Sequence, residues 1–138
     1  MKYCIVFIFL LFTGCVIQTR ENYPLTKTES NFYQRRIEKS MLLDSLNRKI
    51  LKYVPWSKYP KQYTYNLTMY LSGTDNGIDS LAFRVQADSM AHFAVKFMTN
   101  EKMEVHDLFL HYFLNDHSIW FIYQVNDKNQ PILQEYSY

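Results

Sequence analysis

Alternation of apolar and polar residues in the second half of the chain is the feature that most constrains its fold. Residues 63–71 alternate and are rich in aromatic and β-branched side chains, as is typical of strands that bury one face. Residues 103–114 and 118–126 continue the pattern and are separated by a short turn, which predicts a long β pair. Residues 131–136 read as an edge strand that begins with proline. We therefore expect a mostly antiparallel sheet.

Two further strands are expected between these segments. Residues 81–87 also alternate, and the turn residues at 73–77 would join them to the strand at 63–71 as a hairpin. Residues 89–99 fit both a helix and a strand. The tight turn expected at 99–102 favours the strand.

An amphipathic helix is expected before the sheet, at residues 30–53. Its predicted face has the spacing of a helix and includes Lys39, Leu43, Leu46, Ile50 and Tyr53, of which Leu43, Leu46 and Ile50 are expected to pack on the sheet. Thr26, followed by Glu29 three residues later, matches a capping box, and Ser30 is an alternative N-cap. Pro55 ends the helix because it disfavours helical backbone before it. The predicted fold class is α+β, with one N-terminal amphipathic helix packed on a five- to six-stranded, mostly antiparallel sheet.

The first 15 residues concern location rather than fold. An uninterrupted apolar run of ten residues, at 3–12, is too short to cross a bilayer but has the length of a signal-peptide core. The sequence Phe12-Thr13-Gly14-Cys15 that follows resembles the lipobox of bacterial lipoproteins. This resemblance implies cleavage before Cys15, a diacylglycerol on its sulfur and, usually, an acylated amine. An ordinary secretory signal that contains a cysteine is the alternative.

The resemblance also bears on the domain organisation of the chain and on its location in the cell. Together with the polar stretch after Cys15, which contains Pro24 and has no clean period, it predicts a signal peptide at 1–14, a lipidated tether at 15–29 and a single α+β domain at 30–138. The residue after the lipidated cysteine is Val16 rather than aspartate. Similarity to enterobacterial lipoproteins then implies an anchor in the outer membrane. Residues 16–21 lack the acidic cluster that some bacterial groups use to send lipoproteins outward, so the protein is expected to face the periplasm.

Composition argues against several classes of function. Both cysteines, Cys4 and Cys15, lie in the leader region, and three glycines in the whole chain cannot build a glycine-rich phosphate loop. The four histidines show no spacing of converging ligands, so neither a metal nor a cofactor is expected. No serine, cysteine or carboxylate pair falls in a catalytic motif, which predicts a protein that is not an enzyme. A net charge of +2 and an envelope location argue against nucleic acid.

Charge is nevertheless unevenly distributed. Residues 16–61 hold ten Lys or Arg and four Asp or Glu, whereas residues 62–138 hold four and nine. A protein-binding surface is predicted from this basic part and an aromatic loop, with the residues Arg35, Arg36, Lys49, Lys52, Trp56 and Tyr59. The alternatives are a basic face that pairs with the chain's own acidic sheet and a Trp56 that closes the core.

Three functions are compatible with these observations. The favoured one is a non-catalytic, lipid-anchored envelope protein that binds another protein, as an assembly subunit or as an immunity-type inhibitor. A cystatin-like or nuclear-transport-factor-like domain that binds a small apolar ligand is the second. The third is an envelope hydrolase with an unfamiliar site.

Overall fold

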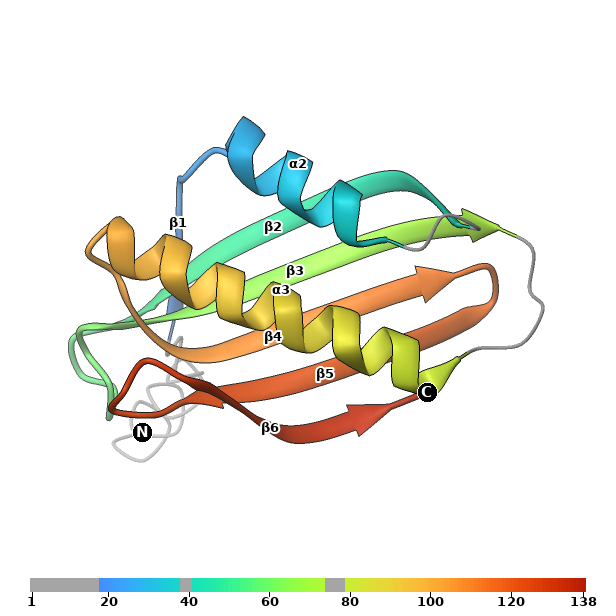
Figure 1. The fold of residues 1–138 in the computed structure, drawn as a ribbon. Helices are drawn as coiled ribbons and strands as arrows, with labels where there is room; N and C mark the ends of the chain where they lie inside the picture. Colours follow the sequence, from blue (N-terminus) through green and yellow to red (C-terminus); the bar gives the residue numbers. More distant parts are fainter. Residues whose placement is uncertain (1–17, 38–40, 74–78) are drawn as a thin grey trace, which may run out of the picture.

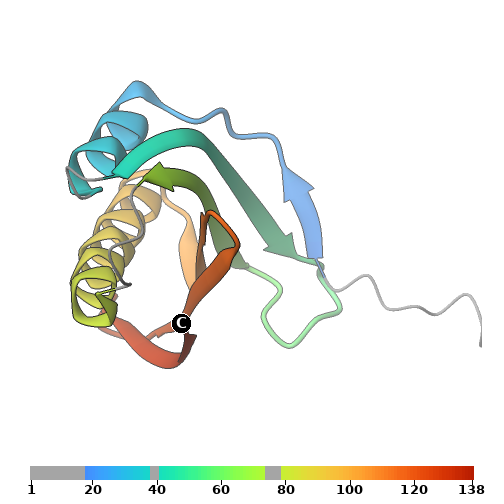
Figure 2. The same cartoon turned by 90° about the vertical axis from the view of Figure 1, so that its right-hand side faces the viewer.

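A six-stranded sheet with two helices on one of its faces makes up the computed structural model, which describes residues 18–37, 41–73 and 79–138 (Figure 1). The elements are β1 (Gln18–Glu21), α2 (Lys27–Arg36), β2 (Met41–Tyr53), β3 (Gln62–Gly73), α3 (Ser80–Asn100), β4 (Glu104–Leu114), β5 (His117–Val125) and β6 (Pro131–Ser137). The strands lie in chain order, and all neighbours are antiparallel except β3 and β4. The sheet curves around the helices (Figure 2). The predicted α+β class and the mostly antiparallel sheet are confirmed.

The last three strands lie where alternation predicts them. β4 and β5 pair from Asp107 opposite Gln124 to Leu114 opposite His117. Asn115 in the turn between them has a φ of 50°, a conformation that asparagine tolerates better than most residues. β6 is hydrogen-bonded to β5 alone and forms one edge of the sheet, as expected.

The predicted helix over residues 30–53 is wrong beyond Arg36. The chain from residue 41 forms β2, which pairs with β1 and β3. A β-bulge after Leu43 shifts the phase of the alternation, so that Leu43, Leu46 and Ile50 all pack against the core. The resulting spacings of three and four residues imitate a helical period, which explains the error.

The predicted hairpin of β3 with residues 81–87 is also wrong, because the second segment belongs to α3. Phe83 and Ala87 are buried, whereas Leu81 and Val85 are 69% and 62% exposed. Gln86 and Met90 are buried as well, so burial recurs every three to four residues here and does not alternate. Over seven residues, the two patterns share Phe83 and Ala87 and are difficult to distinguish.

The ambiguous residues 89–99 continue α3, so the strand that we favoured does not form. Asp79 begins this helix by accepting hydrogen bonds from the backbone N–H groups of Leu81 and Ala82. Because α3 crosses one face of the sheet, β4 returns parallel to β3. Among the described residues, neither helix is long and apolar enough to cross a membrane.

Part of the segment predicted as a tether, residues 15–29, belongs to the fold. β1 pairs with the end of β2, with Gln18 opposite Tyr53. The predicted capping box is confirmed: Thr26 Oγ1 accepts from the Glu29 N–H at 3.2 Å, and Glu29 Oε2 accepts from the Thr26 N–H at 3.0 Å. The predicted boundary at residue 30 thus falls inside α2.

One apolar core lies between the helices and the sheet. Its fully buried large side chains include Tyr65, Leu67 and Met69 of β3, Leu108 and Tyr112 of β4, Phe121 of β5, and Phe83, Met90 and Met98 of α3. The rings of Phe32 and Phe93 stack with centroids 3.9 Å apart and join α2 to α3. These contacts fix which face of the sheet the helices cover.

A buried ion pair joins α2 to β2 within this core. The Glu29 carboxylate and the Arg48 guanidinium are 2.9 Å apart, and their side chains are 0% and 1% exposed. Glu29 Oε1 also accepts from the Tyr65 hydroxyl at 3.0 Å, and that hydroxyl is hydrogen-bonded to the hydroxyl of Tyr33. Burial raises the pKa of both tyrosines, so both remain neutral.

Arg48 also binds the chain that connects β1 to α2. Its Nη1 donates to the Tyr23 carbonyl at 3.1 Å, and its Nη2 donates to the Pro24 carbonyl at 2.9 Å. A planar guanidinium suits this arrangement, because its donors point to several acceptors at once. The pair therefore positions α2 over the sheet.

Candidate binding surface on the open face of the sheet

The sheet face opposite the helices, which we call the open face, is covered by no described helix (Figure 2). Alternation and strand register place polar residues of β2 and β3 and aromatic residues of β4 and β5 side by side on it. The open face includes Asn47, Lys49, Thr64, Asn66, Thr68, Tyr70, Phe109, His111, Phe113, Trp120 and Ile122.

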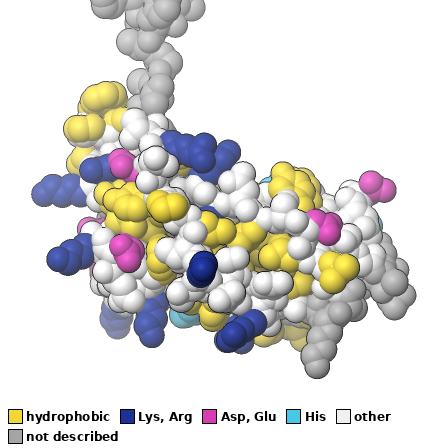
Figure 3. Space-filling model, turned by 90° about the horizontal axis from the view of Figure 1, so that it is seen from above, with side chains coloured by type: hydrophobic (Ala, Val, Ile, Leu, Met, Phe, Trp, Pro, Cys, Tyr) yellow, Lys and Arg dark blue, Asp and Glu magenta, His cyan; other side chains and the backbone are white. Residues whose placement is uncertain are grey.

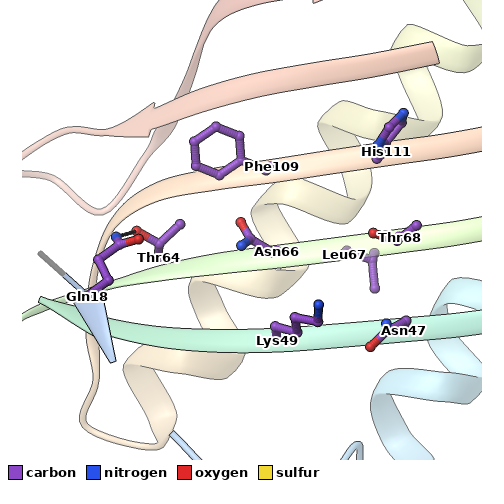
Figure 4. A pocket seen from close by; sticks show the side chains of 9 residues that line it. All are labelled: Gln18, Asn47, Lys49, Thr64, Asn66, Leu67, Thr68, Phe109 and His111. Atoms are coloured by element: carbon purple, nitrogen blue, oxygen red, sulfur yellow. Dashed lines mark hydrogen bonds between the residues drawn. The ribbon is translucent and has the colours of Figure 1, made fainter. Parts of the chain in front are cut away.

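A hollow of about 410 Å³ occupies the polar part of the open face. Its lining consists of Gln18, Asn47, Lys49, Thr64, Asn66, Leu67, Thr68, Phe109 and His111 (Figure 4). Gln18 of β1 donates a hydrogen bond to the Thr64 hydroxyl and so closes one end. Asn66 Oδ1 is buried and has no hydrogen-bond partner in the described chain. An unpaired buried acceptor is costly, so this atom favours a partner that supplies a donor.

The aromatic part of the open face is continuous with the hollow through Phe109. The Phe109 and Tyr70 side chains are 38% and 44% exposed. Tyr70 stacks on Phe113 with centroids 5.0 Å apart, and the His111 ring lies 4.1 Å from the same Phe113 ring. Exposed aromatic side chains in a contiguous group are typical of surfaces that bind proteins.

His111 is the titratable group at the centre of this surface. Burial lowers the pKa of His111 below its ordinary value of 6.5, so its ring is neutral at pH 7. His111 Nε2 is 2.6 Å from the Ser118 hydroxyl oxygen, a hydrogen bond across β4 and β5. Within the described ranges, no hydrogen bond joins His111 to a carboxylate that would orient it, as nucleophilic hydrolases require.

Trp56 and Tyr59, both predicted to bind a partner, lie in the loop at residues 54–61 between β2 and β3. Trp56 is 74% exposed, so the alternative in which it closes the core is wrong. Tyr59 is half-buried, and its ring lies 3.9 Å from that of His106 and 5.7 Å from that of Tyr53. The loop thus has a packed tyrosine and an unpacked tryptophan.

The four predicted basic residues do not share a helix face. Arg35 and Arg36 are exposed at the end of α2, whereas Lys49 and Lys52 belong to the far end of β2. Lys49 lines the hollow, and Lys52 Nζ lies 5.7 Å from the centroid of the Tyr63 ring. The predicted surface therefore separates into parts, because residues 41–53 are a strand and not a helix.

The alternative that basic residues pair with the chain's own acidic sheet is not what the described residues show. Among them, Arg48 with Glu29 is the one ion pair between a Lys or Arg and a carboxylate. Basic side chains gather instead toward the left end of the molecule in Figure 3, the end at which β2 runs into residues 54–61 in Figure 1. They are available to an acidic partner or surface.

The sequence predicts a lipid on Cys15 and no metal site. In ranges 18–37, 41–73 and 79–138, no group of three or more His, Cys, Asp or Glu converges as metal ligands would. Cys15 and Val16, on which the predicted lipidation and sorting depend, lie outside the described residues.

The hollow itself was missed from the sequence, although a signal for part of it was present. Thr64, Asn66 and Thr68 are the polar phase of the alternation that predicts β3. The apolar phase predicts the strand, and the polar phase marks its outer face. Which residues of β2 and β4 lie beside Thr64, Asn66 and Thr68 depends on the register of the sheet, which the sequence does not give.

Comparison with known proteins adds no family to this description. No family model, no curated protein and no solved structure matches the chain. Its function has to be argued from the open face and the sequence.

Proposed function

We propose that this chain is a non-catalytic, lipid-anchored protein of the bacterial cell envelope that binds another protein through the open face. The single observation that carries the binding proposal is the set of exposed Tyr70 and Phe109 and half-buried Phe113 on one face of the sheet, beside a polar hollow with an unpaired acceptor. The anchoring proposal is supported by the lipobox-like sequence that ends at Cys15. An assembly subunit and an immunity-type inhibitor are both proteins of this kind.

The shape and chemistry of the open face favour a protein over a small apolar ligand. Sites for small apolar molecules are concave and mostly lined by apolar side chains. Here most of the residues that line the hollow carry amides, hydroxyls, the Lys49 ammonium or the His111 ring, beside Leu67 and Phe109, and the other aromatic residues lie next to it on a sheet. Protein interfaces combine such aromatic side chains with polar groups that accept and donate hydrogen bonds.

Anchoring is tested by replacing Cys15 with serine. Wild-type protein is expected to incorporate a labelled fatty acid and to sediment with outer-membrane markers in a density gradient. Cys15→Ser removes the thiol that would carry the lipid, so it should lose the label and be released or remain unprocessed. A wild-type protein that takes up no fatty acid would refute the anchor, and one that bands with the inner membrane would refute the sorting.

Binding through the open face is tested by cross-linking in intact envelopes. A photoreactive amino acid placed at Phe109 should give a discrete cross-linked product with a second protein. The matched control places it at Val85, which is 62% exposed on α3, on the other side of the molecule. Lys49→Glu should reduce the product from Phe109, because it reverses the charge at the edge of the same hollow. Equal products from Phe109 and Val85, or none from Phe109, would contradict the proposal.

A further inference from the structure

The loop at residues 54–61, which we call the Trp56 loop, holds one large aromatic side chain out in solvent. Its backbone is fixed by hydrogen bonds from the Ser57 N–H to the Val54 carbonyl at 2.9 Å and from the Gln62 N–H to the Tyr59 carbonyl at 3.0 Å. Val54 is buried, and Tyr59 packs on His106. Trp56 lies between these two attachment points and is 74% exposed. The loop therefore presents Trp56 on a supported backbone.

The Trp56 loop is also basic. Lys58 and Lys61 are exposed on it, and the Lys58 ammonium lies 5.4 Å from the centroid of the Tyr59 ring. No Asp or Glu occurs in the sequence between Asp44 and Asp75. The carboxylate that shares a small hollow with the loop is Glu104, which accepts a hydrogen bond from the Gln62 amide at 2.8 Å. Lysines beside an exposed tryptophan match the polar and apolar layers of a lipid headgroup region.

Strand pairing places this loop beside the point at which a lipid anchor would enter. Gln18, the first residue of β1, pairs with Tyr53, the last residue of β2. Cys15 lies three positions before Gln18, Trp56 lies three positions after Tyr53, and an extended chain spans at most about 3.6 Å per position. Paired Cα atoms are about 5 Å apart. The Cα atoms of Cys15 and Trp56 are therefore within about 27 Å whatever the conformation of the connecting residues.

We propose that the Trp56 loop binds the surface of an anionic bilayer, with Trp56 at the headgroup level and Lys58 and Lys61 on lipid phosphates. This inference rests on the proposed lipid anchor, which would keep the loop next to the membrane. Docking at this end of β2 would hold the molecule in one orientation and leave the open face accessible to a protein in the periplasm. Tryptophan and lysine in the loop are thus assigned to lipid rather than to the protein partner.

The test supplies the tether chemically, so that it does not depend on acylation in the cell. The mature chain from Cys15 is coupled through the Cys15 thiol to a maleimide lipid in vesicles of phosphatidylcholine, with or without phosphatidylglycerol. Trp120→Phe leaves Trp56 as the sole tryptophan, and brominated lipids report its contact with the bilayer by quenching. If Trp120→Phe does not fold, the difference between wild type and Trp56→Phe gives the same signal.

Trp56 fluorescence should shift to the blue and be quenched on vesicles with phosphatidylglycerol. Replacing both Lys58 and Lys61 with glutamine should weaken docking by on the order of tenfold or more, since each lysine near an anionic surface contributes about fivefold. The matched control replaces Arg35 and Arg36, exposed at the other end of the roughly 40 Å β2 strand, and should leave quenching unchanged.

Absence of quenching on anionic vesicles would overturn the proposal. So would equal losses from the lysine pair and the arginine pair, because that result would mean a non-specific effect of net charge. Protection of Trp56 by an envelope protein and not by lipid would assign the loop to a protein partner instead. Failure of fatty-acid labelling would refute the anchor in the cell and would leave this vesicle result unaffected.

Discussion

Replacing Arg48 with methionine removes the cation from the buried ion pair and keeps a side chain of similar length. In the folded protein, Glu29 would remain fully buried and would retain its hydrogen bonds from Thr26 and Tyr65. It would lose the guanidinium 2.9 Å away. Removing one partner of a buried pair costs about 3–5 kcal/mol, because the other charge is left uncompensated. We expect Arg48→Met to lower the free energy of unfolding by that amount.

The measurement is urea unfolding followed by circular dichroism, with the midpoint and the slope compared among variants at one pH. A double variant, Glu29→Gln with Arg48→Met, removes both charges and keeps an oxygen that can cap α2. It should be more stable than Arg48→Met alone, because apolar or neutral replacement of a whole buried pair is often nearly neutral. Arg36→Met, on the exposed end of α2, should change stability by less than about 0.5 kcal/mol.

Two results would refute this reasoning. A loss below about 1 kcal/mol for Arg48→Met would mean that water or movement of α2 compensates the buried carboxylate. A double variant less stable than Arg48→Met would mean that Glu29 contributes through its hydrogen bonds and not through the charge of Arg48.

Three further predictions concern the core and the titratable groups. Ile50→Ala should lower stability by about 2–5 kcal/mol in the same assay, since Ile50 is 1% exposed; a loss under about 1 kcal/mol would contradict its packing. The pKa of His111 is lowered in the fold, so unfolding takes up a proton and stability falls as the pH drops through 6.5 toward the folded pKa; His111→Gln should flatten this slope in urea midpoints, and an unchanged slope would refute it. The pKa values of Tyr33 and Tyr65 are raised, so they ionise only on unfolding, and the thermal midpoint should fall above about pH 10; ordinary titration of all tyrosines in the intact fold would contradict this.

Local patterns in the sequence determined much of the sheet and one helix start. Alternation is a property of each strand, and it predicts β3, β4, β5 and β6 wherever no bulge interrupts the inward-facing phase. The capping box of Thr26 and Glu29 predicts the beginning of α2, because its two hydrogen bonds join residues only three apart. Such patterns can be recognised in the sequence because they depend on residues that are close along the chain.

The tertiary structure decided the choices between strand and helix that depend on contacts between residues far apart in the sequence. The bulge after Leu43 gives the inward-facing residues of β2 the spacing of a helix. Only the pairing of this segment with β1 and β3 distinguishes a strand from a helix there. Residues 81–87 satisfy both patterns, and packing of the Phe83 and Ala87 side chains of α3 into the core selects the helix. That choice makes β3 and β4 parallel.

The candidate surface was decided in the same way. The hollow of the open face combines side chains of β1, β2, β3 and β4, and its composition therefore depends on the register of every pairing between them. A shift of one residue would turn Asn66 and Phe109 toward the core. The sequence by itself determined that these residues alternate with apolar ones. Only the buried contacts on the other face of the sheet decided that they meet, because those contacts fix the register.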